Sequence, residues 1–458
     1  MMATRKNDNG IVSMILYSKD SGTNWDVSKD VSADCRDPHI AEWGRGEILV
    51  LVYCGDGQKV FRTRDMGDTW NAASDLLTRV WITTQPIPRG EGWLVGALIT
   101  AKFHGRNVML YTQKVSHPPG ERNDKALYLW VADSNHTVYF GPFSVETGAK
   151  RAFANTLLYS GDALYVLQGM GDGKTDSVFL FRIAEELRKI KSIVRKWIEV
   201  DVFFSGLSTP TTGLVGVLSD SSADGKWKDM YRCVDATVLG ATRIEDGFKF
   251  TGHGARGIWP VNSRGENKPY TFVDASFTLV ATVVIEEMPP GGGSVPLLGA
   301  MLEDGVGTKF LGLACAENSM WETIFDEKTG QGGFWAPKFE YQVALMLNEN
   351  KGFFYLDAEL LGNSDTMRRR EERAHDVVGF YFGGDDSGWD SRVSVRNVFL
   401  YNRILTPEEL RMVKKTGSPK HESSSSESSG PDSSVHESVY CVLLVSLGLW
   451  AIAVLYGM

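Results

Sequence analysis

Two short segments place a carboxylate, a glycine and a tryptophan at fixed spacing. They begin at residues 18 and 63, so they lie 45 residues apart, and they share the pattern S/T-x-D-x-G-x-x-W. The carboxylate can accept N–H bonds in a tight turn, the glycine can adopt positive φ, and the tryptophan can pack beneath the turn. We therefore expect structural hairpin turns, called Asp boxes, at Ser18, Asp20, Gly22, Trp25, Thr63, Asp65, Gly67 and Trp70.

The spacing of the boxes is that of one blade of a β-propeller. Each box follows a strand-like run, at residues 11–17 and 60–62, as a hairpin requires. Short strands separated by Gly, Asn and Asp turns continue to residue 182. Residues 1–182 are therefore predicted to form an incomplete β-propeller of about three or four blades.

A change of period follows the last of these strands. Ile183, Leu187, Ile190, Val194 and Trp197 recur every three or four residues, which predicts an amphipathic connecting helix over 183–205. Short alternating strands with glycine turns return from 206 to 416, and they favour an antiparallel β-sandwich. The predicted fold class is all-β, with one helix between propeller and sandwich.

The final strand of the predicted sandwich covers residues 393–403, VSVRNVFLYNR. Strict alternation would bury one face of this strand. That face would contain Val393, Val395, Asn397, Phe399 and Tyr401. An asparagine among apolar neighbours must then find hydrogen-bond partners inside the core.

Composition excludes some partners. The net charge is -9, so nucleic acid and anionic membrane surfaces are not expected partners. The five cysteines include no CxxC pair and no Cys/His cluster at zinc spacing, so we expect no structural metal. Cys35, Cys54, Cys233 and Cys315 could form at most two disulfides or remain buried thiols.

The C-terminus has the parts of a targeting signal. Residues 417–438 are Ser-rich and almost without apolar residues, so we expect a disordered spacer. Residues 439–458 are mostly apolar and uncharged. Together they predict a glycolipid (GPI) anchor attached at Ser428, Ser429 or Gly430 and display on the cell surface. A retained tail anchor and a buried helix are the alternatives.

The N-terminus does not match that signal. Residues 1–9 are polar and offer no hydrophobic signal segment, so the chain is expected to be a fragment of a longer surface protein. One sequon, Asn135-His136-Thr137, predicts N-glycosylation at Asn135 if the chain is secreted.

The strand at 393–403 resembles the VTVxNVxLYNR signature of the trypanosomal trans-sialidase superfamily, with Ser394 where Thr is usual. Segments 79–81, 127–130, 231–234 and 296–299 are also similar to family segments, in family order. The resemblance implies a six-bladed sialidase propeller with its first blades missing here, a connecting helix and a concanavalin A-like lectin sandwich.

The resemblance also implies a set of catalytic positions. Active members clamp the sugar carboxylate with three arginines, and they use a tyrosine nucleophile, a Glu base and an Asp acid/base. The first arginine and the Asp belong to the portion missing here. Of the other positions, Asp37 matches the carboxylate base, Phe153 or Ala154 replaces the tyrosine, and Val52 and Asp124 replace two arginines.

We therefore expect a catalytically inactive, adhesin-like surface glycoprotein that needs no cofactor. Its expected partners are host-cell surface glycans or proteins, and a membrane through the glycolipid anchor. The expected binding residues are Arg392, Arg396, Asn397, Tyr401 and Arg403, unless their strand is a buried core element. The alternative function is an exo-α-sialidase or trans-sialidase acting on α-linked sialic acid.

Overall fold

The computed structural model describes most of the chain between residues 2 and 413. The described ranges are 2–7, 10–31, 35–44, 46–54, 57–72, 95–116, 125–146, 151–172, 175–221, 225–261, 270–274, 276–287, 294–302, 304, 307–325, 328–349, 351–361, 365–366, 377–384 and 392–413. The predicted Ser-rich spacer, the hydrophobic tail and the proposed anchor positions Ser428, Ser429 and Gly430 lie outside them.

The strands before the helix form four separate antiparallel sheets. The first contains β1 (Met2–Asn7), β2 (Gly10–Tyr17) and β3 (Asp26–Val27). The second contains β4 (Cys35–Gly44), β5 (Glu47–Cys54), β6 (Gly57–Thr63) and β7 (Asn71–Ala72). The third contains β8 (Val95–Phe103), β9 (Arg106–Ser116), β10 (Lys125–Ala132) and β11 (Thr137–Val145). The fourth contains β12 (Arg151–Ser160), β13 (Ala163–Gly171) and β14 (Asp176–Arg182).

These sheets bury their apolar side chains mainly against the neighbouring sheet. One small core joins the second and third sheets and includes Leu49, Leu51, Leu98 and Trp130. Another joins the first and second sheets through Ile15, Val31, Cys35, Val50 and Val52. Each sheet therefore acts as a propeller blade, because it depends on the next sheet to cover its apolar face.

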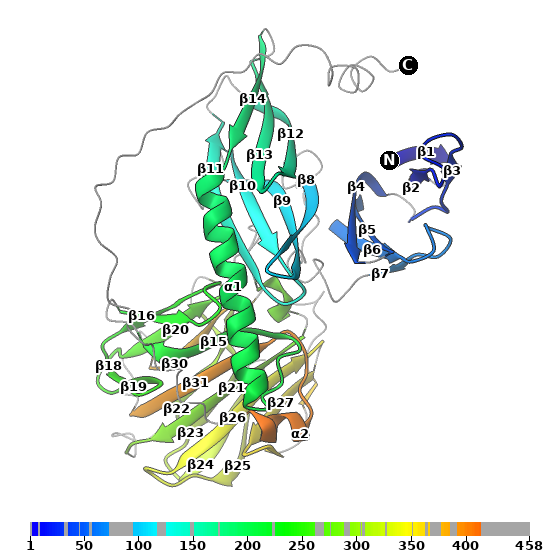
Figure 1. Cartoon of the computed structure of the whole chain (residues 1–458). Coiled ribbons are helices and arrows are strands. Elements are labelled where there is room, and N and C mark those ends of the chain that lie inside the picture. Colours follow the sequence, from blue (N-terminus) through cyan, green and yellow to red (C-terminus); the bar gives the residue numbers. More distant parts are fainter. Residues whose placement is uncertain are drawn as a thin grey trace, which may run out of the picture.

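Helix α1 (Ala184–Gly206) runs beside the third and fourth sheets and reaches the sandwich below them (Figure 1). Its buried face contains Leu187, Ile190, Val194, Trp197, Val200 and Phe204. That face shares one hydrophobic core with residues of both blades and sandwich. The helix thus continues past Trp197, the last of the periodic apolar residues in the sequence, to Gly206. It packs against both the blades and the sandwich.

The sandwich follows the helix as two facing antiparallel sheets (Figure 1). In the first sheet, β31 (Val393–Tyr401) pairs with β21 (Ser276–Ile285) on one side and with β15 (Leu214–Ser221) and β19 (Gly247–Phe250) on the other. The sheet continues through β26 (Glu340–Asn348) and β27 (Lys351–Leu356) to β28 (Glu359–Leu360) and β29 (Asp365–Thr366), and β18 (Ala241–Ile244) pairs with β19.

The second sheet has the order β25 (Lys328–Phe334), β24 (Met320–Phe325), β23 (Lys309–Cys315), β22 (Val295–Leu302), β30 (Val377–Gly383), β20 (Arg256–Pro260), β17 (Ala236–Leu239) and β16 (Lys226–Asp229). β16 also pairs with β15, which links the two sheets at one edge. A single large core fills the space between them. Phe277 and Phe380 meet edge to face across it, with ring centroids 5.1 Å apart.

The short helix α2 (Pro407–Met412) closes the described chain. Its first turn is fixed by a capping box, in which the Thr406 hydroxyl accepts from the Glu409 backbone and the Glu409 carboxylate accepts from the Thr406 backbone. Such reciprocal bonds satisfy two backbone donors that the first turn cannot pair itself. The helix therefore starts at a fixed residue directly after β31 and its turn.

The strict alternation predicted for β31 is wrong. Val393 and Val395 face the core between the sheets, as do Val398 and Leu400, whereas Phe399 and Tyr401 face the core shared with α1. A β-bulge at Asn397 causes the change, because residues 397 and 398 together oppose Ala281 of β21. Asn397 has φ 47°, a left-handed conformation that asparagine tolerates better than most residues.

The cysteines take two states. Cys35 is buried and disulfide-bonded, and Cys54 stands opposite it in the register of β4 and β5. Cys233 and Cys315 are free thiols. Burial raises the pKa of Cys315 to about 12, so this thiol stays protonated and unreactive at neutral pH.

Candidate functional site

Both Asp boxes form the same network of hydrogen bonds. The Asp20 carboxylate accepts the Asn24 backbone N–H at 2.7 Å, and the Asp65 carboxylate accepts that of Thr69 at 2.9 Å. In each box the Ser18 or Thr63 hydroxyl accepts the glycine N–H, at 2.7 Å and 2.8 Å. Gly22 and Gly67 have φ values of 91° and 89°, which side chains rarely tolerate.

The two box carboxylates are held ionised. The Asn24 backbone and side chain and the Ser18 hydroxyl lower the pKa of Asp20. The hydroxyls of Thr69 and Thr63 lower the pKa of Asp65 well below its usual range. Hydrogen bonds from its own turn occupy both oxygens of each carboxylate. This geometry fits a structural role better than ligand binding.

The tryptophans of the two boxes have different surroundings. The Trp70 indole donates at 3.0 Å to the backbone carbonyl of Lys29, which directly follows the first sheet in the chain. The Trp25 indole donates to Gly22 within its own box at 3.1 Å, and its side chain is 53% exposed. Only the second box therefore connects one blade to another.

Among the residues predicted at the sialidase catalytic positions, Val52 is the one whose side-chain surroundings the structure describes. Val52 is fully buried in the apolar core between the first and second sheets. An arginine there would have its charge removed from water without a partner, which costs several kcal/mol. Val52 therefore cannot clamp a carboxylate, and its surroundings suit an aliphatic side chain.

The remaining members of the set are described only in part. Asp37 lies in β4, where the register with β5 shifts between residues 36 and 39. Phe153 lies at a register shift in β12, and Ala154 pairs with Gly169 of β13. Asp124 lies outside the described residues. Neither a phenyl ring nor a methyl group can act as a nucleophile.

Two of the predicted binding residues lie at the start of β31: Arg392 directly precedes the strand, and Arg396 lies in its first half. Arg392 forms an ion pair with Glu287, and Arg396 contacts Glu340 at 3.5 Å. The Ser394 hydroxyl between them donates to Glu286. Each of these three contacts reaches a glutamate outside β31, either directly after β21 or in β26. Both arginines are half-buried.

The other three predicted binding residues are engaged within the fold. Ser219 donates to the Asn397 side-chain oxygen at 2.8 Å, and the buried Tyr401 hydroxyl donates to the Pro210 carbonyl at 3.0 Å. Arg403 donates to both Glu409 carboxylate oxygens, at 2.9 Å and 2.6 Å. The start of β31 thus carries half-buried charged side chains on its outer face, whereas Asn397 and Tyr401 further along are buried.

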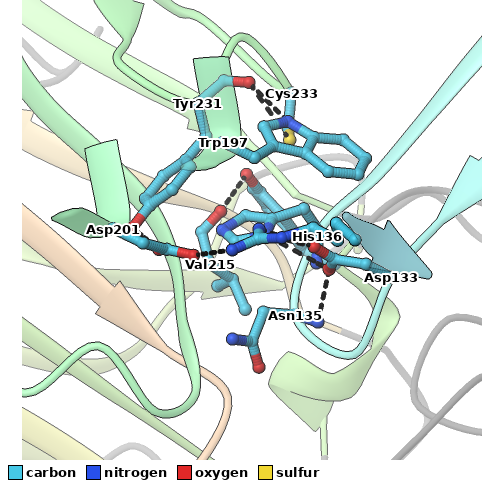
Figure 2. Close-up of polar contacts among 10 residues, drawn as sticks. Asp133, Asn135, His136, Trp197, Asp201, Val215, Tyr231 and Cys233 are labelled. Carbon is cyan, nitrogen blue, oxygen red and sulfur yellow. Dashed lines mark hydrogen bonds and ion pairs between the residues drawn. The ribbon is translucent and has the colours of Figure 1, made fainter. Parts of the chain in front are cut away.

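A buried polar cluster joins the blades, the helix and the sandwich (Figure 2). Arg106 of β9 pairs with Asp133, at the end of β10, at 2.9 Å and also pairs with Asp201 of α1. The Tyr231 hydroxyl of the sandwich donates to the other Asp201 oxygen at 2.8 Å. Blades, helix and sandwich therefore meet through one guanidinium, two carboxylates and one tyrosine hydroxyl.

Aromatic rings close this junction cluster. The His136 ring lies 4.1 Å from the Tyr231 centroid and 5.1 Å from that of Trp197, and the Trp197 indole donates to the Tyr231 carbonyl at 2.9 Å. Burial alone would raise the pKa of Asp133, but His136 and Arg106 together lower it. The cluster thus keeps a buried carboxylate ionised by pairing it.

No sequence pattern predicts this cluster, because its members are far apart in the chain: Arg106 and Asp201, which form one of its ion pairs, are separated by 95 residues. The one signal nearby was the sequon. Asn135 occupies the same turn, where its backbone N–H donates to Asp133 at 2.7 Å. Figure 2 shows its side chain pointing away from the rings of His136, Trp197 and Tyr231.

No group of three or more His, Cys, Asp or Glu side chains in the described ranges could hold a metal ion. No helix within the same part of the chain is long and apolar enough to cross a membrane.

Comparison with known proteins agrees with this architecture. Residues 1–169 match the BNR repeat-like domain, and residues 210–408 match the trans-sialidase C-terminal domain. The structure of Trypanosoma rangeli sialidase superposes with a TM-score of 0.75 at 33% sequence identity, over 88% of this chain and 66% of that one. The molecule is a sialidase-type propeller region joined to a lectin-like sandwich, as the sequence predicted.

Curated relatives identify the family. Sialidase 85-1.1 of Trypanosoma cruzi is 41% identical over 431 residues, which cover 90% of this chain and 57% of the relative. Sialidase 85-1.3 of the same organism is 41% identical over 177 residues, 37% of this chain and 99% of the relative. The chain belongs to the trans-sialidase superfamily and spans little more than half of the first of these relatives.

Proposed function

We propose that this chain is a trans-sialidase-like surface glycoprotein that binds host-cell glycans or proteins and does not turn over sialic acid. The observation that carries the proposal is the burial of Val52 in an apolar core, at a position where active relatives are expected to hold an arginine. A guanidinium clamp supplies the bidentate recognition that orients a carboxylate substrate, and a valine supplies none of it.

The residues at the nucleophile position support the same proposal. Glycoside cleavage by this family needs a hydroxyl at the position that Phe153 or Ala154 occupies. A base such as Asp37 has no proton to remove when that hydroxyl is missing. Two independent parts of the catalytic set are therefore altered, and restoring either one alone would leave the other missing.

Display outside the cell is the second part of the proposal. The disulfide of Cys35 suits an oxidising compartment such as the secretory pathway. The apolar segment 439–458 and the small residues near Ser428 supply the parts of a glycolipid anchor signal. A glycan at Asn135 would be compatible with the same route.

The outer face of β31 is the binding surface that we favour. Arg392, Ser394 and Arg396 lie there beside Glu286, Glu287 and Glu340. Charged groups at an exposed surface steer association and fix its orientation. Asn397 and Tyr401 are left out of the favoured surface because their side chains are buried. Arg403 is left out because it lies beyond β31, where it donates to both carboxylate oxygens of Glu409.

Binding of the full-length chain to host cells tests this surface. An Arg392→Ala/Arg396→Ala variant should bind several-fold more weakly than the parent, because two cationic groups are removed. The control variant Arg188→Ala/Arg411→Ala removes the same charge from exposed positions on α1 and α2 and should bind like the parent. Equal binding by both variants would exclude this part of β31 as the binding surface.

A sialidase or trans-sialidase activity is the second candidate, and the names of the relatives favour it. A solved structure of Trypanosoma rangeli sialidase in complex with sialic acid is 33% identical to this chain. A fluorogenic α-sialoside assay on purified full-length chain separates the candidates. Turnover above that of a heat-inactivated sample would overturn the non-enzymatic proposal, whereas none is expected.

A further inference from the structure

Two exposed phenylalanines bound the turn between β25 and β26. Phe334 is the last residue of β25, and Phe339 directly precedes β26. Their side chains are 76% and 63% exposed, the highest values for any aromatic residue of the described ranges. Between them only Trp335 is buried. Large apolar side chains gathered in one exposed segment mark an interaction site more often than single ones do.

The segment 334–339, here called the distal loop, is held in place by the sandwich. The Trp335 N–H donates to the carbonyl of Ser319, which directly precedes β24, at 2.9 Å. The Lys338 N–H donates to the carbonyl of Ile285, the last residue of β21, at 2.7 Å. The two phenyl rings are therefore displayed by a fixed backbone.

The rings of the distal loop continue the core of the sandwich beyond its end. The Phe339 ring centroid lies 5.6 Å from that of Tyr341, which in turn meets the Trp321 ring edge to face at 5.2 Å. Trp321 belongs to the core between the two sheets, and Tyr341 packs against it. The Phe339 ring thus lies at the end of the sandwich, apart from the outer face where Glu340 meets Arg396.

This end of the sandwich is the one away from the helix. β26 contributes Ala344 and Met346 to the core that it shares with α1 and the blades. Phe339 precedes the opposite end of the same strand, about 23 Å from Met346 at the usual rise per residue. The exposure of the distal loop therefore belongs to the part of the sandwich that is remote from the blades.

The described chain ends close to the same part of the sandwich. The Gln342 side chain donates to the Val413 carbonyl at 2.6 Å, and Gln342 lies about 10 Å along β26 from Phe339. Residues 414–438 alone separate Val413 from the apolar segment 439–458 of the proposed anchor. A bilayer that holds this anchor is therefore tethered to the distal loop, which raises its effective concentration there.

The charge of the distal loop suits a bilayer surface. Lys338 is exposed and forms no ion pair with any described residue. The glutamates of the neighbouring segments each have a cationic partner, in the pairs Glu286–Lys249, Glu287–Arg392 and Glu340–Arg396. Aromatic rings with a lysine beside them are typical of the headgroup region of a membrane.

We propose that the distal loop inserts Phe334 and Phe339 into the headgroup region of the phospholipid bilayer that carries the anchor of this chain, with Lys338 at the lipid phosphates. Burial of the two rings drives the insertion, so a neutral phosphatidylcholine surface suffices despite the net charge of -9. The proposal rests on the display proposed above and goes beyond it, because it determines which end of the sandwich faces the membrane.

Quenching by nitroxides attached to lipid headgroups tests the docking. The full-length chain is reconstituted in phosphatidylcholine liposomes through its apolar tail and isolated by flotation. A fluorescent label at Ala336→Cys reports on the distal loop, and a label at Ser192→Cys on α1 is the control, since both positions are exposed. The parent, with Cys233 and Cys315 as free thiols, gives the labelling background. The label at position 336 should be quenched about threefold more than that at position 192, and equal quenching would overturn the docking.

Removal of the rings tests the apolar contact. Phe334→Ser/Phe339→Ser, made in the Ala336→Cys chain, should lower the quenching to the level of the control position. Leu239→Ser/Leu360→Ser removes two other apolar side chains of the sandwich, 49% and 48% exposed, and should leave the quenching unchanged. Full quenching in the phenylalanine variant would refute insertion of the two rings.

Two further outcomes separate this proposal from its alternatives. An unquenched label at position 336, together with weaker host-cell binding by Phe334→Ser/Phe339→Ser, would assign the distal loop to a host-cell partner and overturn the docking. Failure of the chain to float with the liposomes would overturn the display and the docking together. A chain that floats with an unquenched label at position 336 would contradict the docking alone.

Discussion

The sandwich and the blade region use the same kind of strand but complete their cores differently. The two sheets of the sandwich cover one another, and their large aromatic residues, such as Trp259, are fully buried. The blades form small cores between successive sheets. Apolar side chains at both ends of the series stay exposed, as Trp25 and Val178 show.

This difference follows from how each region is closed. Two facing sheets need only each other, so the sandwich buries its apolar faces within one unit. A blade is covered by its neighbours, so the outer faces of a series depend on what lies beyond them. Stability should therefore be concentrated in the sandwich and decrease toward the outer blades.

The largest expected effect contrasts two tryptophans. Trp259→Ala should lower the free energy of unfolding of the sandwich by about 3–5 kcal/mol, because it empties a fully buried site and removes the indole bond to Val234 at 2.8 Å. Trp25→Ala in the first box should cost less than about 1 kcal/mol. Urea unfolding followed by hydrogen exchange in each region measures both. Similar losses would contradict the contrast.

The next effect concerns the junction between the regions. Arg106→Ala should destabilise the contact by about 2–3 kcal/mol, because Asp133 loses its guanidinium partner while staying buried. The blade region should then unfold before the sandwich in a separate thermal transition. Arg188→Ala on the exposed side of α1 breaks only a surface pair with Glu185 and should change little. A single unchanged transition in Arg106→Ala would show that apolar packing alone joins the regions.

A smaller effect is expected at the bulge of β31. Asn397→Ala should cost about 1–2 kcal/mol, since alanine strains at positive φ and the bond from Ser219 is lost. Asn397→Gly also loses the bond from Ser219, but glycine adopts positive φ without strain. The glycine variant should therefore be more stable than the alanine variant. Denaturant midpoints of the sandwich compare the two. A glycine variant no more stable than the alanine variant would argue against backbone strain at this position.

The smallest effect is a pH dependence of the boxes. The pKa of Asp65 is lowered from 3.8 by Thr69 and Thr63, so its stabilisation is present above about pH 4 and is lost as the pH falls below that value. The protection of the Thr69 amide against hydrogen exchange, measured relative to the unstructured chain at the same pH, should decrease on acidification, and Asp65→Asn should remove most of this pH dependence. Asp20 should respond alike, but only the second box should also release the first sheet, through Trp70.

Much of the architecture could be predicted from the sequence because it depends on local patterns. The two boxes, the period of the helix and the signature of the last strand led to an all-β fold of propeller and sandwich, which the relatives confirm. The candidate site was only partly predictable. The replacements that the sequence predicts at Val52 and Phe153 stay predictions, whereas the role of each residue in β31 depended on a bulge that alternation cannot reveal.

The sequence by itself determined which turns, strands and helix form, because turn hydrogen bonds and periodicity act over a few residues. Tertiary structure decided which of two equivalent tryptophans is covered, since the partner of Trp70 is a carbonyl 41 residues away. It also decided that Arg106, Asp133, Asp201 and Tyr231 meet, because long-range packing brings together charges that no local pattern relates. Finally, one left-handed asparagine turned Phe399 and Tyr401 toward the helix, because an extra residue in a strand exchanges its two faces.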